Sequence, residues 1–481
     1  MIERMTRIGS RLIAAPRALL QPAAGASVVR RIFGAMLTVG GFTILVKLVS
    51  TLKDATVARQ FGVSDAMDAF GIAYILPSAA ISIIAGSLNM ALIPTFVGVR
   101  ERKGLAAANQ LFSGVVTLSA ILLGIVAVLL ALIAPVALPL IGAKFGPQKL
   151  ALTHRLMLLL LPTLLTTGLG ALCSGALMAG DRFALAAAVP AVTPLLIFAS
   201  VLGLSRNCGI YTLAIGLLAG SMVELGLLAW GLSRNGISIV PRWPKLDPAT
   251  REVFRQCAPL TAGALIFSGS VLVDQAIASR AAPGSVAALN YAAKVAAALT
   301  SIGANAVGLA VLPHLSRLVA RDDWAGIRRV LWVYGRLLLM ISVPVMLVFC
   351  AFSEPIVRLL FQRGAFTVQD THLVAAIQRM YLLQIPFYIL GILLVRAITA
   401  LNANHVLLWV CILNLSVNTI LDILFLRWFG VPGIALSTSG VYVISSSGVF
   451  LILMRILKSR ENPAPNVPDA VPAFAVSEAG L

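Results

Sequence analysis

The chain has 481 residues, of which 59% are hydrophobic and only 11% are charged, and its mean hydropathy is +0.97. This composition excludes a soluble globular protein and indicates an all-α polytopic membrane protein. A net charge of +19 would suggest nucleic-acid binding in a soluble protein, but we expect no nucleic-acid partner, because Lys and Arg accumulate in the cytoplasmic segments of membrane proteins.

Residues 1–31 are rich in arginine and contain one acid, Glu3. They lack the continuous apolar core and small-residue cleavage site of a secretory signal. We expect a basic cytoplasmic arm that sets the orientation of the first helix. At the other end, residues 458–481 are proline-rich and without periodicity, which predicts a disordered cytoplasmic tail.

Apolar stretches of about 20 residues or more, the length of a membrane-spanning helix, recur between these ends. We predict about twelve transmembrane helices, with cores near 33–52, 68–98, 107–141, 150–179, 184–204, 209–233, 253–281, 286–318, 328–352, 370–402, 405–426 and 431–457. Because the number is even and most Lys and Arg fall on one side, both termini are expected in the cytoplasm.

A proline-containing loop at 235–252 divides these helices into two predicted lobes of six, at 32–234 and 253–457. The second lobe echoes the first: a shift of 219 residues places Ala69 on Ala288 and Pro94 on Pro313. Six helices per copy give both copies the same orientation, and transporters built from such parallel repeats bind substrate between the halves.

Residues 47–98 place charged side chains within apolar helices. A charge at bilayer depth costs several kcal/mol unless it faces protein or water, so we expect a shared cavity. The segment contains Lys53-Asp54, Ala58-Arg59, Phe61-Gly62, Asp68-Ala69-Phe70, Leu76-Pro77 and Pro94, and the chain continues with LNYAAKV (289–295), Leu312-Pro313 and FQRGAFT (361–367). In this ordered set the segment resembles the opening hairpin of the MurJ/MviN lipid II flippases, in the multidrug, oligosaccharidyl-lipid and polysaccharide exporter superfamily.

The resemblance covers roughly residues 33–457 and implies a bacterial inner-membrane transporter. It implies an alternating-access flippase that moves a polyprenyl-pyrophosphate-linked glycan, lipid II or similar, to the outer leaflet for peptidoglycan synthesis. Cell-envelope glycan synthesis proteins are the implied protein partners. Many family members have two further C-terminal helices, which we do not expect here.

Lys47 and Lys53 share nearly one helical face, and Lys294 comes from the opposite lobe. Three ammonium groups facing one chamber would suit a pyrophosphate, whereas snorkelling to the interface is the alternative for Lys53. By resemblance the family has arginines at these positions, and ammonium lacks their bidentate fork. The candidate substrate-binding residues are Lys47, Lys53, Lys294, Arg59, Asp68 and Arg396.

The neighbours Lys53 and Asp54 are a candidate gate, because an ion pair that breaks and reforms can switch access. A static ion pair at the interface is the competing interpretation.

Asn414, Asn418 and Asp422 recur every four residues and therefore share a helical face. With Asp274, Thr438 and the Ile434 carbonyl, they provide oxygen ligands suited to a hard monovalent cation. The resemblance implies a sodium site at matching helices, and we expect Na⁺ or H⁺ as the coupling ion. Interhelical hydrogen bonding is the alternative for these polar groups.

Phosphate-loop, HExxH and GxSxG motifs are absent, and the five cysteines are scattered. We therefore expect a transporter rather than an enzyme, with no cofactor and no metal beyond the monovalent ion. The departures from the family pattern leave other cargoes open: an exopolysaccharide or O-antigen-type repeat unit, or a drug exported with a cation. A non-transporting scaffold is a further alternative, which the buried charges disfavour.

Overall fold

The computed structural model describes residues 24–180, 182–237, 248–401 and 403–461. Within these ranges the chain forms helices and short connections, without strands. Most of the predicted basic arm (1–23), the central part of the inter-lobe loop (238–247) and most of the tail (462–481) lie outside the described residues. The all-helical prediction is confirmed.

Nine helical stretches of the described chain are long and apolar enough to cross a membrane. One of them is α3 (Asp65–Ile141), whose 77 residues would extend roughly 115 Å if straight, several times the thickness of a bilayer core. The helix breaks at Gly104, where φ is +81°. The chain is therefore a multi-pass membrane protein, while the count of twelve and the internal repeat stay predictions.

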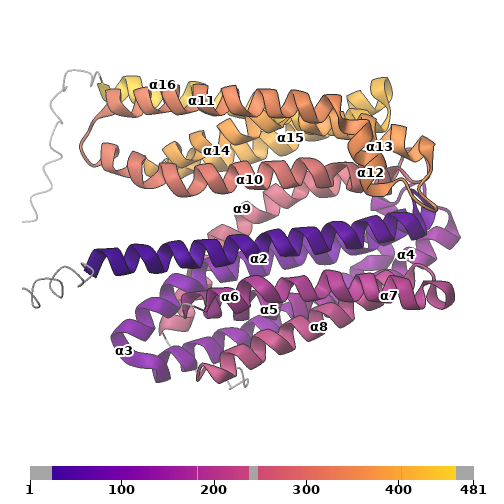
Figure 1. The fold of residues 1–481 in the computed structure, drawn as a ribbon, viewed down its shortest axis with the longest axis horizontal. Coiled ribbons are helices and arrows are strands. Elements are labelled where there is room, and N and C mark those ends of the chain that lie inside the picture. Colours follow the sequence, from indigo (N-terminus) through magenta and orange to yellow (C-terminus); the bar gives the residue numbers. More distant parts are fainter. Residues whose placement is uncertain (1–23, 181, 238–247, 402, 462–481) are drawn as a thin grey trace, which may run out of the picture. The chain divides into compact units, whose positions relative to one another are not determined.

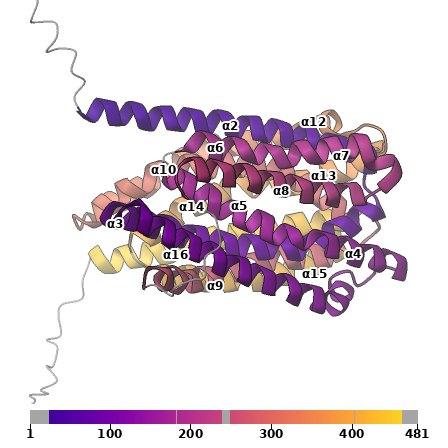
Figure 2. The same cartoon turned by 90° about the horizontal axis from the view of Figure 1, so that it is seen from below.

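The described chain divides into two compact units. Unit 1 contains the residues up to Leu265 and, from far along the sequence, Leu360–Thr367. Its helices are α2 (Ala24–Phe61), α3, α4 (Pro147–Leu160), α5 (Pro162–Ala179), α6 (Phe183–Ala188), the 3₁₀ turn η1 (Val189–Ala191), α7 (Val192–Cys208), α8 (Tyr211–Arg234) and the start of α9 (Pro248–Ala278). In this unit α2 runs along α6 and α7 (Figures 1 and 2).

The core of unit 1 holds the two halves of α3 together. Phe96, before the break, and Phe112, after it, are fully buried and meet edge to face with 6.1 Å between ring centroids. Such aromatic pairs add about 1 kcal/mol to the gain from burial. Val253 and Cys257 of α9 belong to the same core, so the first turns of α9 are fixed against α3.

Unit 2 contains residues 266–359 and the described residues from Val368 onward. Its helices are the rest of α9, α10 (Ser285–Val319), α11 (Trp324–Ala351), α12 (Ser353–Phe361) except its last two residues, α13 (Val368–Leu382), α14 (Ile385–Ala400), α15 (Asn404–Phe429) and α16 (Val431–Glu461). A tight turn at Gly430 (φ +65°) lets α16 fold back against α15.

Candidate functional site

Three helices of unit 2 bring together a cluster of buried polar side chains. Asn418 and Asp422 lie one turn apart on α15, Asp274 comes from α9, and Thr438 comes from α16. Asp422 is fully buried, Asn418 is 2% exposed and Asp274 is 8% exposed. The four-residue spacing read from the sequence therefore corresponds to one inward face of α15.

A single amide bridges the two carboxylates of this cluster. The Nδ2 of Asn418 donates to Asp274 Oδ1 at 3.0 Å and to Asp422 Oδ2 at 3.1 Å. Thr438 Oγ1 lies 3.4 Å from Asp274 Oδ2 and 3.2 Å from the Ile434 carbonyl. Five of the six predicted residues thus lie together within one unit. The sixth, Asn414, lies one turn earlier on α15, where its Nδ2 donates to Ser445 at 3.2 Å.

Ser437 also belongs to the cluster and was not predicted from the sequence. Its hydroxyl donates to Asp422 Oδ1 and contacts the Ile434 carbonyl at 2.7 Å. Its sequence position could have indicated this role. Ser437 precedes Thr438 and lies three residues after Ile434, whose carbonyl is a candidate ligand. A hydroxyl there adds another oxygen to the set.

The cluster borders a cavity of about 100 Å³ that is lined by Asp274, Asn414, Asn418, Thr438 and Tyr442 among others. Two neighbouring buried carboxylates repel each other and lose hydration when both are charged. A cation or a proton between them would relieve both costs. The residues present fit a hard monovalent cation, since every side-chain ligand is an oxygen from a carboxylate, an amide or a hydroxyl.

The basic hairpin of unit 1 has a different geometry. Lys47 is exposed, while Lys53 is 22% exposed and its Nζ lies 2.8 Å from Asp54 Oδ1. The candidate gate is therefore a closed ion pair between sequence neighbours. Arg59 has an exposed side chain, and its backbone carbonyl accepts a hydrogen bond from the Ala365 amide at 2.8 Å.

Asp68 is 2% exposed and forms an ion pair with Lys149, at the start of α4, with 2.9 Å between Nζ and Oδ2. Lys149 also contacts Asp65 at 2.5 Å and lies 3.9 Å from the centroid of the Phe145 ring. Asp68 is a predicted substrate ligand, whereas Lys149 was not predicted from the sequence. The structure holds this carboxylate on a cation of the same unit.

The remaining substrate candidates belong to unit 2. The Nζ of Lys294 lies 5.3 Å from the centroid of the Tyr291 ring. The Nε of Arg396 is buried and has no hydrogen-bond partner among the described residues. Because Lys47 and Lys53 lie in unit 1 and Lys294 in unit 2, a common chamber for the three lysines stays a prediction.

This multi-pass helical fold is shared by solved structures of membrane transporters. A multidrug resistance MATE family transporter of the MOP superfamily, in an inward-facing conformation, matches with a TM-score of 0.72 at 14% identity over 88% of this chain and 99% of that chain. The lipid II flippase MurJ, in an inward closed conformation, matches with a TM-score of 0.74 at 21% identity over 88% and 90%.

The family model described as lipid II flippase MurJ matches residues 57–466, so the chain belongs to this family. A probable lipid II flippase MurJ of Rhizobium tropici is 26% identical over 87% of this chain and 80% of the relative. The lipid II flippase MurJ of Burkholderia cenocepacia is 25% identical over 72% and 69%. The resemblance seen in the opening hairpin is thereby confirmed.

Proposed function

We propose that this protein is a flippase that moves lipid II from the cytoplasmic to the outer leaflet of the bacterial inner membrane, for peptidoglycan synthesis. The observation that carries the proposal is the match of the MurJ family model across residues 57–466. Relatives named as lipid II flippases match most of the chain, and both termini are proposed to lie in the cytoplasm.

In this proposal Lys47, Lys53 and Lys294 bind the pyrophosphate when the chain is open to the cytoplasm. Charge-assisted hydrogen bonds to phosphate are roughly twice as strong as neutral ones. Lysine acts as a point charge without a directional fork, so the site would hold the phosphates by charge more than by geometry. Arg59, Asp68 and Arg396 complete the proposed substrate-binding set.

Cation binding at Asp274 and Asp422 is the proposed energy input. With the site empty the two carboxylates favour separation, and a bound Na⁺ or H⁺ favours the arrangement in which Asn418 bridges them. A ligand shifts an equilibrium only through its different affinity for the two states. The membrane potential would add about 2.3 kcal/mol per charge for each 100 mV.

Opening and closing of the Lys53 and Asp54 pair is proposed to control access from one side. The two residues are adjacent, so the pair can break without a large movement of the backbone. Both side chains keep partial contact with solvent, at 22% and 14% exposure, so breaking the pair costs less than breaking a fully buried one, and a charged cargo arriving at Lys53 could offset that cost.

Complementation of a bacterium depleted of its lipid II flippase tests the proposal. The wild-type chain is expected to restore growth, Lys294→Ala to lose the rescue, and Lys294→Arg to keep it. The matched control is Arg427→Ala, which removes an exposed cation of unit 2 at the end of α15. Absence of rescue by a well-expressed, membrane-inserted wild-type chain would overturn the proposal.

By resemblance, the family has arginines at the positions of the three lysines. This difference favours a second candidate cargo, an exopolysaccharide or O-antigen-type lipid-linked repeat unit. A strain that lacks the flippase for such a unit distinguishes the two: rescue there, without rescue of the lipid II defect, would assign the second cargo. Drug efflux without any glycan phenotype would instead assign a cation-coupled exporter.

A further inference from the structure

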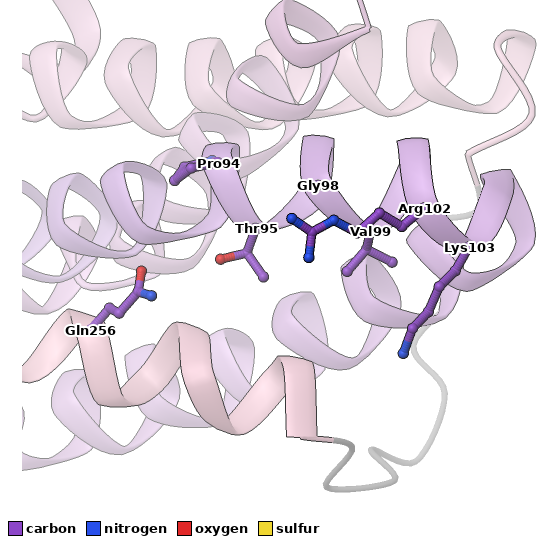
Figure 3. Close-up of a pocket in the computed structure, with 7 residues that line it drawn as sticks. All are labelled: Pro94, Thr95, Gly98, Val99, Arg102, Lys103 and Gln256. Atoms are coloured by element: carbon purple, nitrogen blue, oxygen red, sulfur yellow. The ribbon is translucent and has the colours of Figure 1, made fainter.

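Unit 1 contains a pocket outside the proposed cargo and cation sites. It has a volume of about 430 Å³ and lies between the end of the first half of α3 and the first turns of α9. Its lining residues are Pro94, Thr95, Gly98, Val99, Arg102, Lys103 and Gln256 (Figure 3). Since all of them belong to unit 1, the pocket is a property of that unit alone.

The walls of the pocket are fixed by the core. Phe96, between Thr95 and Gly98 in sequence, is fully buried, which orients the neighbouring positions of α3. On the other wall Val253 and Cys257 are buried in the same core, so Gln256 projects from a held segment of α9 (Figure 3). No side chain fills the space beside Gly98, where an added Cβ would meet nothing within 4 Å.

The pocket lies where the apolar part of α3 ends. The helix is apolar through Val99 and then continues as Arg-Glu-Arg-Lys up to the break at Gly104. Such a change from apolar to basic residues marks the level of lipid headgroups. Basic pockets between helices at this level are known sites for anionic headgroups.

Two cations face this space without an ion-pair partner in the part of the chain that the structure describes. Arg102 and Lys103 form no ion pair with other residues in the described ranges. The nearby acid Glu252 is bound by Arg255 at 2.9 Å and by the Gln256 amide at 2.8 Å. The hydrogen bond from Gln256, with Arg255 beside it, holds the pKa of Glu252 below its ordinary value, so its charge is already partnered.

The other polar groups of the pocket are arranged to accept hydrogen bonds. The Thr95 hydroxyl donates its proton to the Ala91 carbonyl at 3.0 Å, which leaves its lone pairs for a ligand donor. Gln256 uses its amide nitrogen on Glu252, which leaves its side-chain oxygen. A phosphoglycerol headgroup has one phosphate for the two cations and two hydroxyls that can donate to these acceptors.

We infer that this pocket binds the headgroup of an anionic glycerophospholipid of the phosphatidylglycerol type. The phosphate lies between Arg102 and Lys103, and the glycerol hydroxyls donate to Thr95 and Gln256. Pro94 and Val99 supply apolar contact for the start of the acyl chains. A choline or ethanolamine headgroup is disfavoured, because its cation would face Arg102 and Lys103. This site is separate from the proposed cargo and cation sites and does not depend on them.

The test measures phosphatidylglycerol bound to the full-length purified protein by native mass spectrometry, with phosphatidylcholine for comparison. Arg102→Gln/Lys103→Gln is expected to weaken binding roughly fivefold for each charge removed. The matched control is Arg455→Gln/Lys458→Gln, which removes two exposed cations at the end of α16. Equal losses of phosphatidylglycerol binding in the two double variants would show only a general attraction between cations and anionic lipid. That result would overturn the proposal.

A second variant separates a shaped pocket from its charge. Gly98→Leu fills the open space, keeps both cations and raises helix propensity, so it is expected to fold and to lose the bound lipid. Gly124→Leu, which also adds a side chain where an added Cβ would meet nothing within 4 Å, is its control. Retention of phosphatidylglycerol by Gly98→Leu would overturn the proposal.

Competition identifies the source of the phosphate. We expect phosphatidylglycerol binding to be unchanged in excess inorganic pyrophosphate and in equimolar undecaprenyl pyrophosphate. Displacement by inorganic pyrophosphate would assign the pocket to a free anion. Displacement by undecaprenyl pyrophosphate would assign it to the lipid-linked cargo. Either displacement would overturn the proposal.

Discussion

The backbone amide of Ala365 donates a 2.8 Å hydrogen bond to the carbonyl of Arg59, at the end of α2. The segment Leu360–Thr367, here named the strap, therefore folds into unit 1, although the chain on both sides of it belongs to unit 2. Two glycines allow this contact. Gly62 and Gly364 have φ of +55° and +60°, and a Cβ on either would overlap a backbone carbonyl of the other segment.

Replacement of Gly364 by alanine is predicted to loosen the strap. Alanine at positive φ costs about 1 kcal/mol, and its Cβ would in addition collide with the Arg59 carbonyl, which belongs to a helix and cannot move aside. We expect the free energy of unfolding to fall by about 2 kcal/mol or more, measured as a lower thermal midpoint of the purified protein.

Gly430→Ala is the control for this prediction. Gly430 has φ of +65°, and an added Cβ there meets nothing within 4 Å. It therefore shares the backbone strain of Gly364 without the collision. Equal destabilisation by the two variants would show that the strap contact contributes nothing beyond backbone strain.

Lys149 is predicted to stabilise the start of α3 through Asp68. Lys149→Met removes the cation 2.9 Å from a carboxylate that is 2% exposed, and removal of one partner of a buried pair costs about 3 kcal/mol. Asp65→Asn removes the other contact of Lys149, but Asp65 is 61% exposed, so a loss of about 1 kcal/mol or less is expected. Chemical unfolding compares the two variants.

The double variant Lys149→Met/Asp68→Asn provides the internal check. With the carboxylate neutralised, most of the stability lost in Lys149→Met should return, because the cost arises from the buried charge. Additive losses in the double variant would mean that Lys149 acts through its packing on Phe145 instead.

The buried polar cluster around Asp422 was predictable because its signal is local. Asn418 and Asp422 fall on one face of a helix by their spacing alone, and a carboxylate such as Asp274 in an apolar helix requires a polar partner. The resemblance then paired the two helices. The break in α3 was also visible, since a basic stretch ending in glycine separates two apolar runs.

The partner of Asp68 was not predictable from the sequence. Lys149 lies 81 residues away, and the contact depends on how α4 packs against α3, which no periodicity encodes. The strap was missed for the same reason: FQRGAFT was visible as a family pattern, but not its hydrogen bond to α2. A chamber shared by Lys47, Lys53 and Lys294 depends on the placement of two units and stays a prediction.

Gly175 is predicted to be required for the packing of α5 on α3. The small-residue tract around it permits close helix approach, and an added Cβ would overlap the side-chain oxygen of Asn89. Because the end of the half-buried Asn89 side chain can rotate away in part, Gly175→Ala is expected to lower stability by about 1 kcal/mol, the low end for overpacking. Gly124→Ala, in open space on α3, should leave stability unchanged or raise it slightly. Recovery in Gly175→Ala/Asn89→Ala would assign the loss to this contact, and no loss in Gly175→Ala would contradict it.

Sodium is predicted to stabilise the folded protein through the carboxylates of Asp274 and Asp422. A ligand that binds only the folded state adds about 2.7 kcal/mol at one hundred times its Kd, so the thermal midpoint should rise with sodium at constant ionic strength set by potassium. Asp422→Asn keeps the shape of the side chain and removes the charge. We expect this variant to lose the sodium response even if its midpoint without sodium is higher.

Gln275→Leu is the control for the sodium prediction. Gln275 is the sequence neighbour of Asp274 and is equally buried, but its amide is bonded to Asn290 at 3.0 Å. This variant should lose stability at every sodium concentration and keep the sodium-dependent rise. A rise that persists in Asp422→Asn would place sodium elsewhere. A wild-type midpoint that changes with pH but not with sodium would instead assign the proton as the ion held between the two carboxylates.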